Sequence, residues 1–128
     1  MVFLDRNYYF RGEKPIIIPH RGGINVVPEN TLHALEHTVE HNFTHFETDL
    51  RMTKDGEIIL NHDATIDRTT HEKGNISELD WEDLKKINAG SRFYERKNVN
   101  KETTFVLLRE ALKTFDELCF NLDLKESG

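Results

Sequence analysis

Cysteine is nearly absent from this 128-residue chain, which contains a single one, Cys119. A lone cysteine excludes any disulfide within the chain and favours a reducing compartment, so we expect a cytoplasmic protein. Long apolar runs are missing too, because none approaches the ~20 residues of a membrane-spanning helix. Asp5 and Arg6 also interrupt the apolar stretch at the start, which argues against a signal peptide.

Basic residues are also fewer than acidic residues. The chain has 17 lysine and arginine residues against 23 aspartate and glutamate residues, which gives a net charge of −6. Because an acidic chain repels the phosphate backbones of nucleic acids, nucleic acid is not an expected partner. A phosphate-bearing small molecule would then need a local positive centre, such as a metal ion. The length is that of one ordinary domain, and no internal repeat or long linker divides it.

The first half of the chain alternates strand-like and helix-like patterns. Residues 16–18 form a short β-branched run that ends at a loop. A helix is expected to follow to about residue 41, with Asn30 or Thr31 as its cap. Residues 45–50 have the pattern of a second strand. A strand, a helix and a strand within about 35 residues predict a parallel βαβ unit.

The sequence next predicts a hairpin. Asp55-Gly56 lies between two apolar runs and is typical of a two-residue turn, which can only join antiparallel strands. Residues 57–61 should therefore return antiparallel to the second strand. A two-residue turn places Asp49 opposite His62, on one face and with Cβ atoms within ~7 Å. A three-residue turn would shift this pairing by one residue.

The remaining elements are shorter and more polar. We expect loops over residues 64–78, a short helix over 81–87 and an irregular segment over 88–103. A further helix is expected over 105–118, with Leu108, Leu112 and Phe115 facing inward. Residues 119–124 form the last predicted strand.

Carboxylates recur at alternate strand positions. Glu47 and Asp49 point to one face of their strand, where two such charges repel each other unless a cation lies between them. Asp123 and Lys125 repeat this spacing on the last strand, and Asp123 would complete a set of hard oxygen ligands for Mg²⁺ or Ca²⁺. The alternative is that both strands simply present a solvated polar face, which is common.

Two histidines and an arginine stand where a site would form. His20 and Arg21 follow the first strand, and loops at the carboxyl ends of parallel strands build the sites of sheets and barrels. His20 and His62 near a metal ion would suit general acid–base catalysis on a phosphate ester. Arg21 would hold a phosphate oxygen. The alternative is a structural role for each histidine.

A second histidine set offers a different hypothesis. His33, His37 and His41 are spaced four residues apart on the first predicted helix, so their imidazoles share one helix face. That arrangement can bind Zn²⁺ or Ni²⁺. The alternative is a solvated polar face opposite the apolar stripe of the same helix.

Five segments, taken in order, give the sequence a recognisable pattern. HRGG, PENT, FETDLRMTKDGEIILNHD, DRTT and LKKINAGSRF resemble the glycerophosphodiester phosphodiesterase family, and the match runs from about residue 16 to 125. The segment FVLLREAL departs from the family, which usually has a polar turn there. At the position of Asp123 the family usually has glutamate, whereas the related sphingomyelinase-D-like enzymes have aspartate.

The resemblance assigns roles to individual residues. It implies metal ligands at Glu47, Asp49 and Asp123 for Mg²⁺ or Ca²⁺, and acid–base histidines at His20 and His62. Arg21 and Lys125 match residues that meet the substrate phosphate, and Glu29 falls at a position that would orient the site. The implied reaction is the metal-dependent hydrolysis of a small-molecule glycerophosphodiester to glycerol 3-phosphate and an alcohol.

The implied fold is α/β, a (β/α)₈ barrel with its site at the C-terminal mouth. Such barrels need about 250 residues. Only three barrel strands and the mouth hairpin are expected here, so we interpret residues 16–128 as the N-terminal half of the domain, preceded by an extension over residues 1–15. A second chain would then complete the barrel, or the chain would be a non-catalytic remnant or interaction module of the family.

Overall fold

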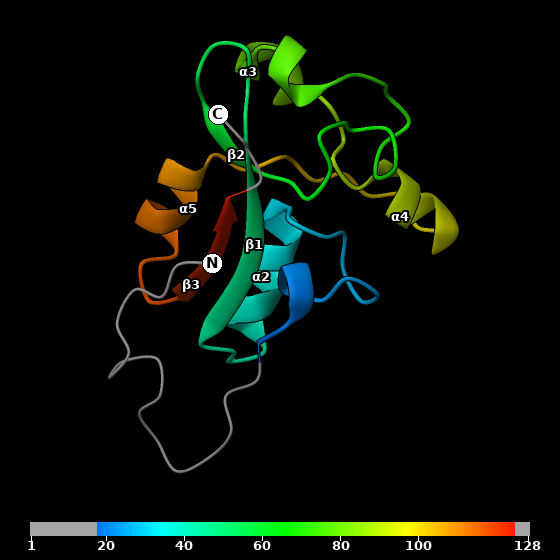
Figure 1. Cartoon of the computed structure of the whole chain (residues 1–128). Coiled ribbons are helices and arrows are strands. Elements are labelled where there is room, and N and C mark those ends of the chain that lie inside the picture. The colour runs from blue at the N-terminus through cyan, green and yellow to red at the C-terminus, as the bar shows by residue number, and fades with distance from the viewer. Residues whose placement is uncertain (1–17, 125–128) are drawn as a thin grey trace.

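The protein is described by a computed structural model over residues 18–124 (Figure 1). Its elements in chain order are η1 (His20–Gly22), α2 (Leu32–Glu40), β1 (His45–Met52), β2 (Ile58–Leu60), η2 (Ile76–Glu78), α3 (Trp81–Leu84), α4 (Ser91–Arg96), α5 (Leu108–Thr114) and β3 (Cys119–Leu124). The predicted extension over residues 1–15, Ile16, Ile17 and Lys125 lie outside the described residues. No helix among the described residues is long and apolar enough to cross a membrane.

The three strands form one sheet in the order β2-β1-β3. β1 pairs with β3 in parallel, from His45 opposite Cys119 to Leu50 opposite Leu124. β1 pairs with β2 antiparallel, as a hairpin requires. The predictions of a last strand over residues 119–124 and of a hairpin after the central strand are therefore confirmed.

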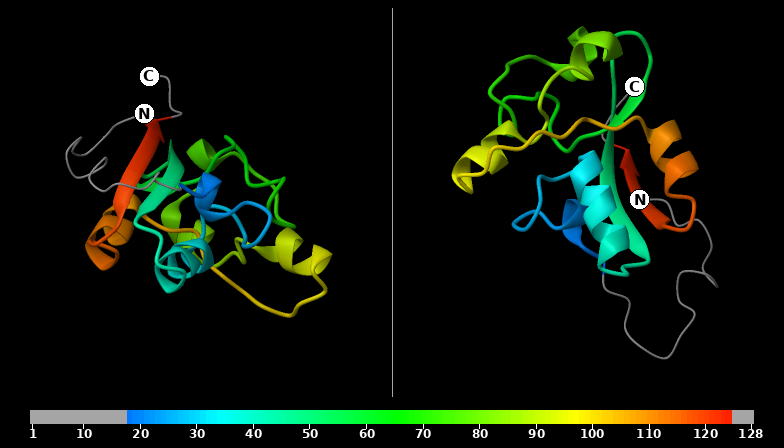
Figure 2. Two further views of the ribbon diagram at one scale, coloured as in Figure 1. Left: turned by 90° about the horizontal axis from the view of Figure 1, so that it is seen from below. Right: turned by 180° about the vertical axis from the view of Figure 1, so that it is seen from behind.

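One face of this sheet packs against α2 and α5, which both lie behind it in Figure 1 and in front of it in the right view of Figure 2. Phe46 of β1 and Phe120 of β3 meet edge to face with ring centroids 5.9 Å apart. Leu35 of α2 and Ala111 of α5 complete this buried cluster. Because side chains alternate along a strand, Glu47 and Asp49 point to the opposite face of the sheet.

The hairpin register differs from the prediction by one residue. Arg51 pairs with Ile59, and the Thr53 amide donates to the Glu57 carbonyl at 2.8 Å, so the turn has three residues. Gly56 closes it in the left-handed conformation, with φ +86°, as three-residue hairpin turns require. Asn61, whose amide donates to the Asp49 carbonyl at 2.9 Å, therefore faces Asp49. The predicted pairing of Asp49 with His62 is wrong.

Side-chain chemistry explains this wider turn. The Asp55 carboxylate accepts hydrogen bonds from the Thr53 hydroxyl at 2.6 Å and from the Trp81 amide at 3.1 Å. The Glu57 amide in turn donates to the Thr53 hydroxyl at 3.0 Å. The turn is thus tied to the start of α3, which is distant in sequence.

Three helix predictions also need correction. Residues 88–103 are not all irregular, because α4 forms over Ser91–Arg96 and buries Phe93 and Tyr94. The expected helix over 81–87 ends at Leu84, and that over 105–118 is helical only over Leu108–Thr114. Phe105 and Leu107 are instead extended and bridge to Thr31 and Ile59. This late start turns Ala111 inward and leaves Leu112 exposed.

Candidate active site

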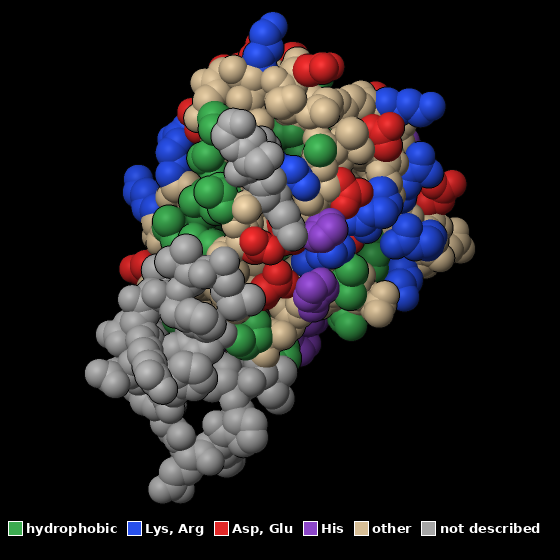
Figure 3. Space-filling view, in the orientation of Figure 1, with side chains coloured by type: hydrophobic (Ala, Val, Ile, Leu, Met, Phe, Trp, Pro, Cys, Tyr) green, Lys and Arg blue, Asp and Glu red, His purple; other side chains and the backbone are tan. Residues whose placement is uncertain are grey.

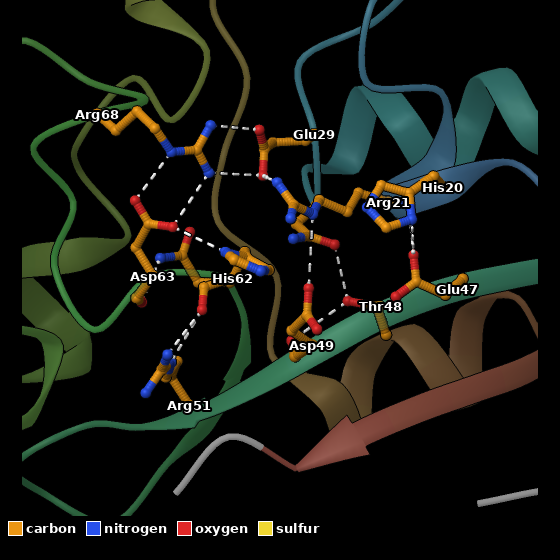
Figure 4. Close-up of polar contacts among 12 residues, drawn as sticks. His20, Arg21, Glu29, Glu47, Thr48, Asp49, Arg51, His62, Asp63 and Arg68 are labelled. Carbon is orange, nitrogen blue, oxygen red and sulfur yellow. Dashed lines mark hydrogen bonds and ion pairs between the residues drawn. The ribbon is translucent and has the colours of Figure 1, made fainter. Parts of the chain in front are cut away.

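The HRGG segment forms a tight turn against β1. Arg21, Gly22 and Gly23 all have left-handed backbone conformations, with φ of 51°, 83° and 106°. The turn brings the Arg21 amide within 2.8 Å of the Glu47 carboxylate, and the same Glu47 oxygen lies 3.2 Å from Nδ1 of His20 (Figure 4). The predicted proximity of His20 and Glu47 is therefore present.

The Arg21 side chain extends from this turn between two carboxylates. Its Nη1 donates to Glu29 at 3.0 Å, and its Nε lies 3.7 Å from Oδ2 of Asp49. Arg21 is only 13% exposed and Asp49 only 3%, so these charges interact in a largely desolvated environment. The guanidinium thus lies between the carboxylates of Glu29 and Asp49 and compensates their negative charge.

The three predicted metal ligands occupy one face of the sheet. Glu47 and Asp49 alternate along β1, and Asp123 of β3 lies in register with Asp49, so its side chain points the same way. Three carboxylates form a donor set suited to a hard divalent cation. Within residues 18–124, however, no three histidine, cysteine or acidic side chains are grouped closely enough to hold an ion as they stand.

His62 reaches the site from the loop that follows β2. Its Nδ1 lies 2.9 Å from a carboxylate oxygen of Asp63, and its carbonyl accepts from the Arg51 guanidinium at 2.7 Å. Hydrogen bonds from Arg68 lower the pKa of Asp63 to about 2, although partial burial acts in the opposite direction. Asp63 is therefore ionised near neutral pH. When Nδ1 of a neutral His62 donates to it, Nε2 carries the lone pair available for proton transfer.

Glu29 is a carboxylate of the site that two arginines hold. Its side chain is 8% exposed and accepts from both Arg21 and Arg68. Burial raises the pKa of Glu29, but the hydrogen bonds and charges of the two arginines outweigh it and lower the pKa below its ordinary value. Asn30, the next residue, has φ 57° and accepts a hydrogen bond from Thr48 at 2.8 Å. The PENT segment is thereby fixed to β1.

Asp63 and Arg68 are site residues that the sequence reasoning missed. Asp63 directly follows His62, and Arg68 stands in the DRTT segment that carried part of the resemblance. Both signals were visible in the sequence. Neither signal indicates that Arg68 contacts both Asp63 and Glu29, because Arg68 and Glu29 are 39 positions apart in the sequence.

The histidines of the first helix do not converge. Nδ1 of His33 lies 2.6 Å from the Tyr94 hydroxyl. Among the described residues, the three imidazoles are not grouped closely enough to hold a metal ion. His37 and His41 lie together, with ring centroids 4.0 Å apart. The three histidines therefore do not form the predicted Zn²⁺ or Ni²⁺ site in this structure.

Acidic and histidine side chains gather on the same face of the molecule, near its centre in Figure 3, and basic side chains lie beside them. In Figure 4, His20 and His62 lie on opposite sides of the Arg21 and Asp49 pair. The arrangement offers two imidazoles, a cationic group and a row of carboxylates around one region. These groups are suited to general acid–base catalysis on an anionic substrate.

Comparisons with known proteins identify relatives of this chain. The Glycerophosphoryl diester phosphodiesterase family profile matches residues 20–126. A glycerophosphodiester phosphodiesterase from Caldanaerobacter subterraneus subsp. tengcongensis is 40% identical over 83 residues, which are 65% of this chain and 34% of the relative. Another from Bacillus altitudinis is 35% identical over 114 residues, which are 87% of this chain and 45% of the relative.

A solved structure gives the same match. A phosphodiesterase from Oleispira antarctica, in complex with the product sn-glycerol-3-phosphate, has a TM-score of 0.77 and 31% identity over 87% of this chain. The match covers 44% of that protein. The chain thus spans about a third to just under half the length of these three proteins.

Proposed function

The chain belongs to the glycerophosphoryl diester phosphodiesterase family, and on that premise we propose that it hydrolyses glycerophosphodiesters to glycerol 3-phosphate and an alcohol. The observation that carries this proposal is the pair of histidines on either side of Arg21 and Asp49. Each histidine has its Nδ1 near a carboxylate, Glu47 for His20 and Asp63 for His62. Each ring is therefore oriented with Nε2 available to exchange a proton.

The proposed reaction uses these groups in turn. One histidine takes the proton of the attacking hydroxyl. Attack by water gives glycerol 3-phosphate directly, whereas attack by the substrate's own glycerol hydroxyl gives a cyclic phosphate that water then opens to glycerol 3-phosphate. The other gives a proton to the leaving alkoxide oxygen as the phosphorus–oxygen bond breaks. Arg21 binds a phosphate oxygen, and Lys125, which lies outside the described residues, is proposed to do the same. The Oleispira antarctica complex with sn-glycerol-3-phosphate supports a phosphate-bearing ligand for this family.

We further propose that Glu47, Asp49 and Asp123 hold a divalent cation, Mg²⁺ or Ca²⁺. The chemistry of the donor set and the shared face of the three carboxylates support this assignment. His20 and the Arg21 amide both contact Oε2 of Glu47, so Oε1 would bind the ion while Oε2 continues to orient His20. Asp49 would exchange the nearby Arg21 guanidinium for the ion. The ion would neutralise phosphate charge and favour attack on phosphorus.

The proposed architecture is part of a (β/α)₈ barrel. A parallel pair with helices on one face has the layering of a barrel wall, and the site of such a barrel lies at the carboxyl ends of its strands. The hairpin would then lie at the C-terminal mouth. We propose that this chain supplies the N-terminal half of such a barrel. Because the far wall would hold the substrate in position, the 128-residue chain alone should turn over slowly.

The test is hydrolysis of glycerophosphocholine by the purified chain with Mg²⁺ or Ca²⁺, followed by the release of glycerol 3-phosphate. We expect slow turnover that EDTA abolishes and that both Asp49→Asn and His62→Ala remove. Glu110→Gln, an exposed change on α5, is the matched control and should leave the rate unchanged. Equal rates in the wild type and Asp49→Asn would contradict the proposed site. The absence of turnover in the wild type would favour a non-catalytic family member.

A further inference from the structure

One guanidinium joins the two halves of the candidate site. Arg68 donates from Nη1 and Nη2 to the two oxygens of Glu29, at 2.8 and 3.0 Å. It donates from Nε and Nη2 to the two oxygens of Asp63, at 2.9 and 3.2 Å (Figure 4). Both contacts are bidentate, a geometry that arginine offers because its donors are fixed in one plane.

Each of these carboxylates also holds a residue of the proposed chemistry. Asp63 contacts Nδ1 of His62 at 2.9 Å, and Glu29 accepts from Arg21 at 3.0 Å. His62 follows β2, whereas Arg21 precedes α2, so they belong to separate loops. The continuous series His62–Asp63–Arg68–Glu29–Arg21 therefore connects an acid–base group to a phosphate-binding group.

We propose that Arg68 is a positioning residue that sets His62 and Arg21 relative to each other, an inference that rests on the proposed function. Arg68 acts through Asp63 and Glu29 and need not touch the substrate. The geometry of its contacts matters more than its charge alone. Arg68 is 48% exposed, and an isolated exposed ion pair contributes little, whereas a bidentate network restrains its members.

Charge and geometry can be separated by two substitutions. Arg68→Lys keeps the positive charge but cannot make two bidentate contacts, and Arg68→Met removes both. If Arg68 acts through geometry, the lysine variant should behave like the methionine variant. If charge alone matters, the lysine variant should behave like the wild type, and the proposal is wrong.

The first readout is independent of turnover. ¹⁵N NMR of the imidazole nitrogens reports which tautomer neutral His62 adopts at pH 8. In the wild type we expect the Nδ1–H tautomer, held by Asp63, and in both Arg68 variants a mixture of tautomers. Amide spectra of β1 and β3 verify that each variant is folded. The same His62 tautomer in the wild type and in a folded Arg68 variant would overturn the proposal, whatever the activity of the chain.

The second readout separates binding from chemistry. Asp63→Asn should lower kcat more than it raises KM, because it affects the proton-transfer group. Glu29→Gln should chiefly raise KM, because it affects the arginine that meets the phosphate. Both Arg68 variants should show both effects, with kcat reduced at least ~10-fold, since a ~1 Å misplacement can cost ~10²-fold. Arg109→Lys and Arg109→Met, which alter an exposed pair with Glu57, are the matched controls and should change neither constant. An unchanged kcat and KM in Arg68→Lys would contradict the positioning role.

Discussion

Gly22 is the residue at which a single added methyl group should do most damage to the candidate site. It has φ +83°, and a Cβ built on it would lie 2.6 Å from Cε2 of Phe46 and 2.8 Å from Cβ of Ala34. Both neighbours belong to the packed core between β1 and α2, so neither can yield without disturbing it. Gly56 provides a matched comparison, because it has φ +86° and no heavy atom within 4 Å of a built Cβ.

The two glycines therefore separate backbone strain from steric overlap. A left-handed conformation costs an L-residue about 1–2 kcal/mol, and both Gly→Ala changes incur it. Overpacking a core adds about 1–3 kcal/mol, and only Gly22→Ala incurs that contribution. The free energy of unfolding should thus fall by about 2–5 kcal/mol for Gly22→Ala and by about 1–2 kcal/mol for Gly56→Ala.

Urea denaturation followed by far-ultraviolet circular dichroism measures both changes on one scale. The His62 imidazole provides a comparison, because it is linked to the HRGG turn indirectly, through Asp63, Arg68 and Glu29. In folded Gly22→Ala we expect the NMR signals of His20 to shift most, because His20 belongs to the turn itself, and those of His62 to shift less. Equal destabilisation by the two alanine substitutions would refute the argument that close packing of the HRGG turn against Phe46 positions His20 and Arg21.

Two further predictions concern charge and packing. Because the pKa of Asp63 is about 2 in the folded protein and 3.8 in the reference state, its contribution to stability is present above about pH 4 and is lost as pH falls towards 2. In urea titrations from pH 6 to 2, the free energy of unfolding should therefore fall less for Asp63→Asn than for the wild type. At pH 7 the substitution should itself cost about 1 kcal/mol after solvent screening. The same pH profile in both proteins would be inconsistent with this role of Asp63. Phe120→Ala should lower the unfolding free energy by about 3–5 kcal/mol in the same assay, because the ring is fully buried against Phe46. A loss below 1 kcal/mol would mean that the two rings do not form the core of the sheet.

Local patterns were sufficient to predict the last strand and the start of the first helix. Residues 120–124 alternate apolar and polar side chains, and the strand has the predicted bounds, Cys119–Leu124. Thr31, one of two expected caps, accepts a hydrogen bond from the Ala34 amide at the start of α2. In each case the period and the cap are set by neighbours in sequence, so no distant contact was needed.

The errors arose where distant contacts decide the conformation. The Asp-Gly pair predicted a two-residue turn, but the contact between Asp55 and Trp81 belongs to a three-residue turn. α4 has only six residues, too short to be stable alone, and it forms because Phe93 and Tyr94 are buried by the rest of the fold. Neither outcome can be read from its own segment of sequence.

The candidate site was also predictable where sequence neighbours decide the structure and not where distant contacts decide it. His20, Glu47 and Asp49 were predicted from strand ends and from alternation along a strand, and β1 and η1 bring them together. The bridge made by Arg68 was not predicted, because it joins a loop after β2 to the segment before α2. Charge patterning identifies charged residues but not which distant carboxylate a long arginine side chain will meet.

The most direct test of the central claim is a binding measurement on the face that carries Glu47, Asp49 and Asp123. The ¹⁵N-labelled chain would be titrated with sn-glycerol 3-phosphate in the presence of Ca²⁺, and amide shifts followed by NMR. We predict shifts in the turn at Arg21 and Gly22 and at the carboxyl ends of β1 and β3, all of which Asp49→Asn should abolish while Glu110→Gln preserves them. Shifts confined to α4 and α5, the same shifts in Asp49→Asn, or no shift at all would contradict the assignment of this face as a phosphate-binding site.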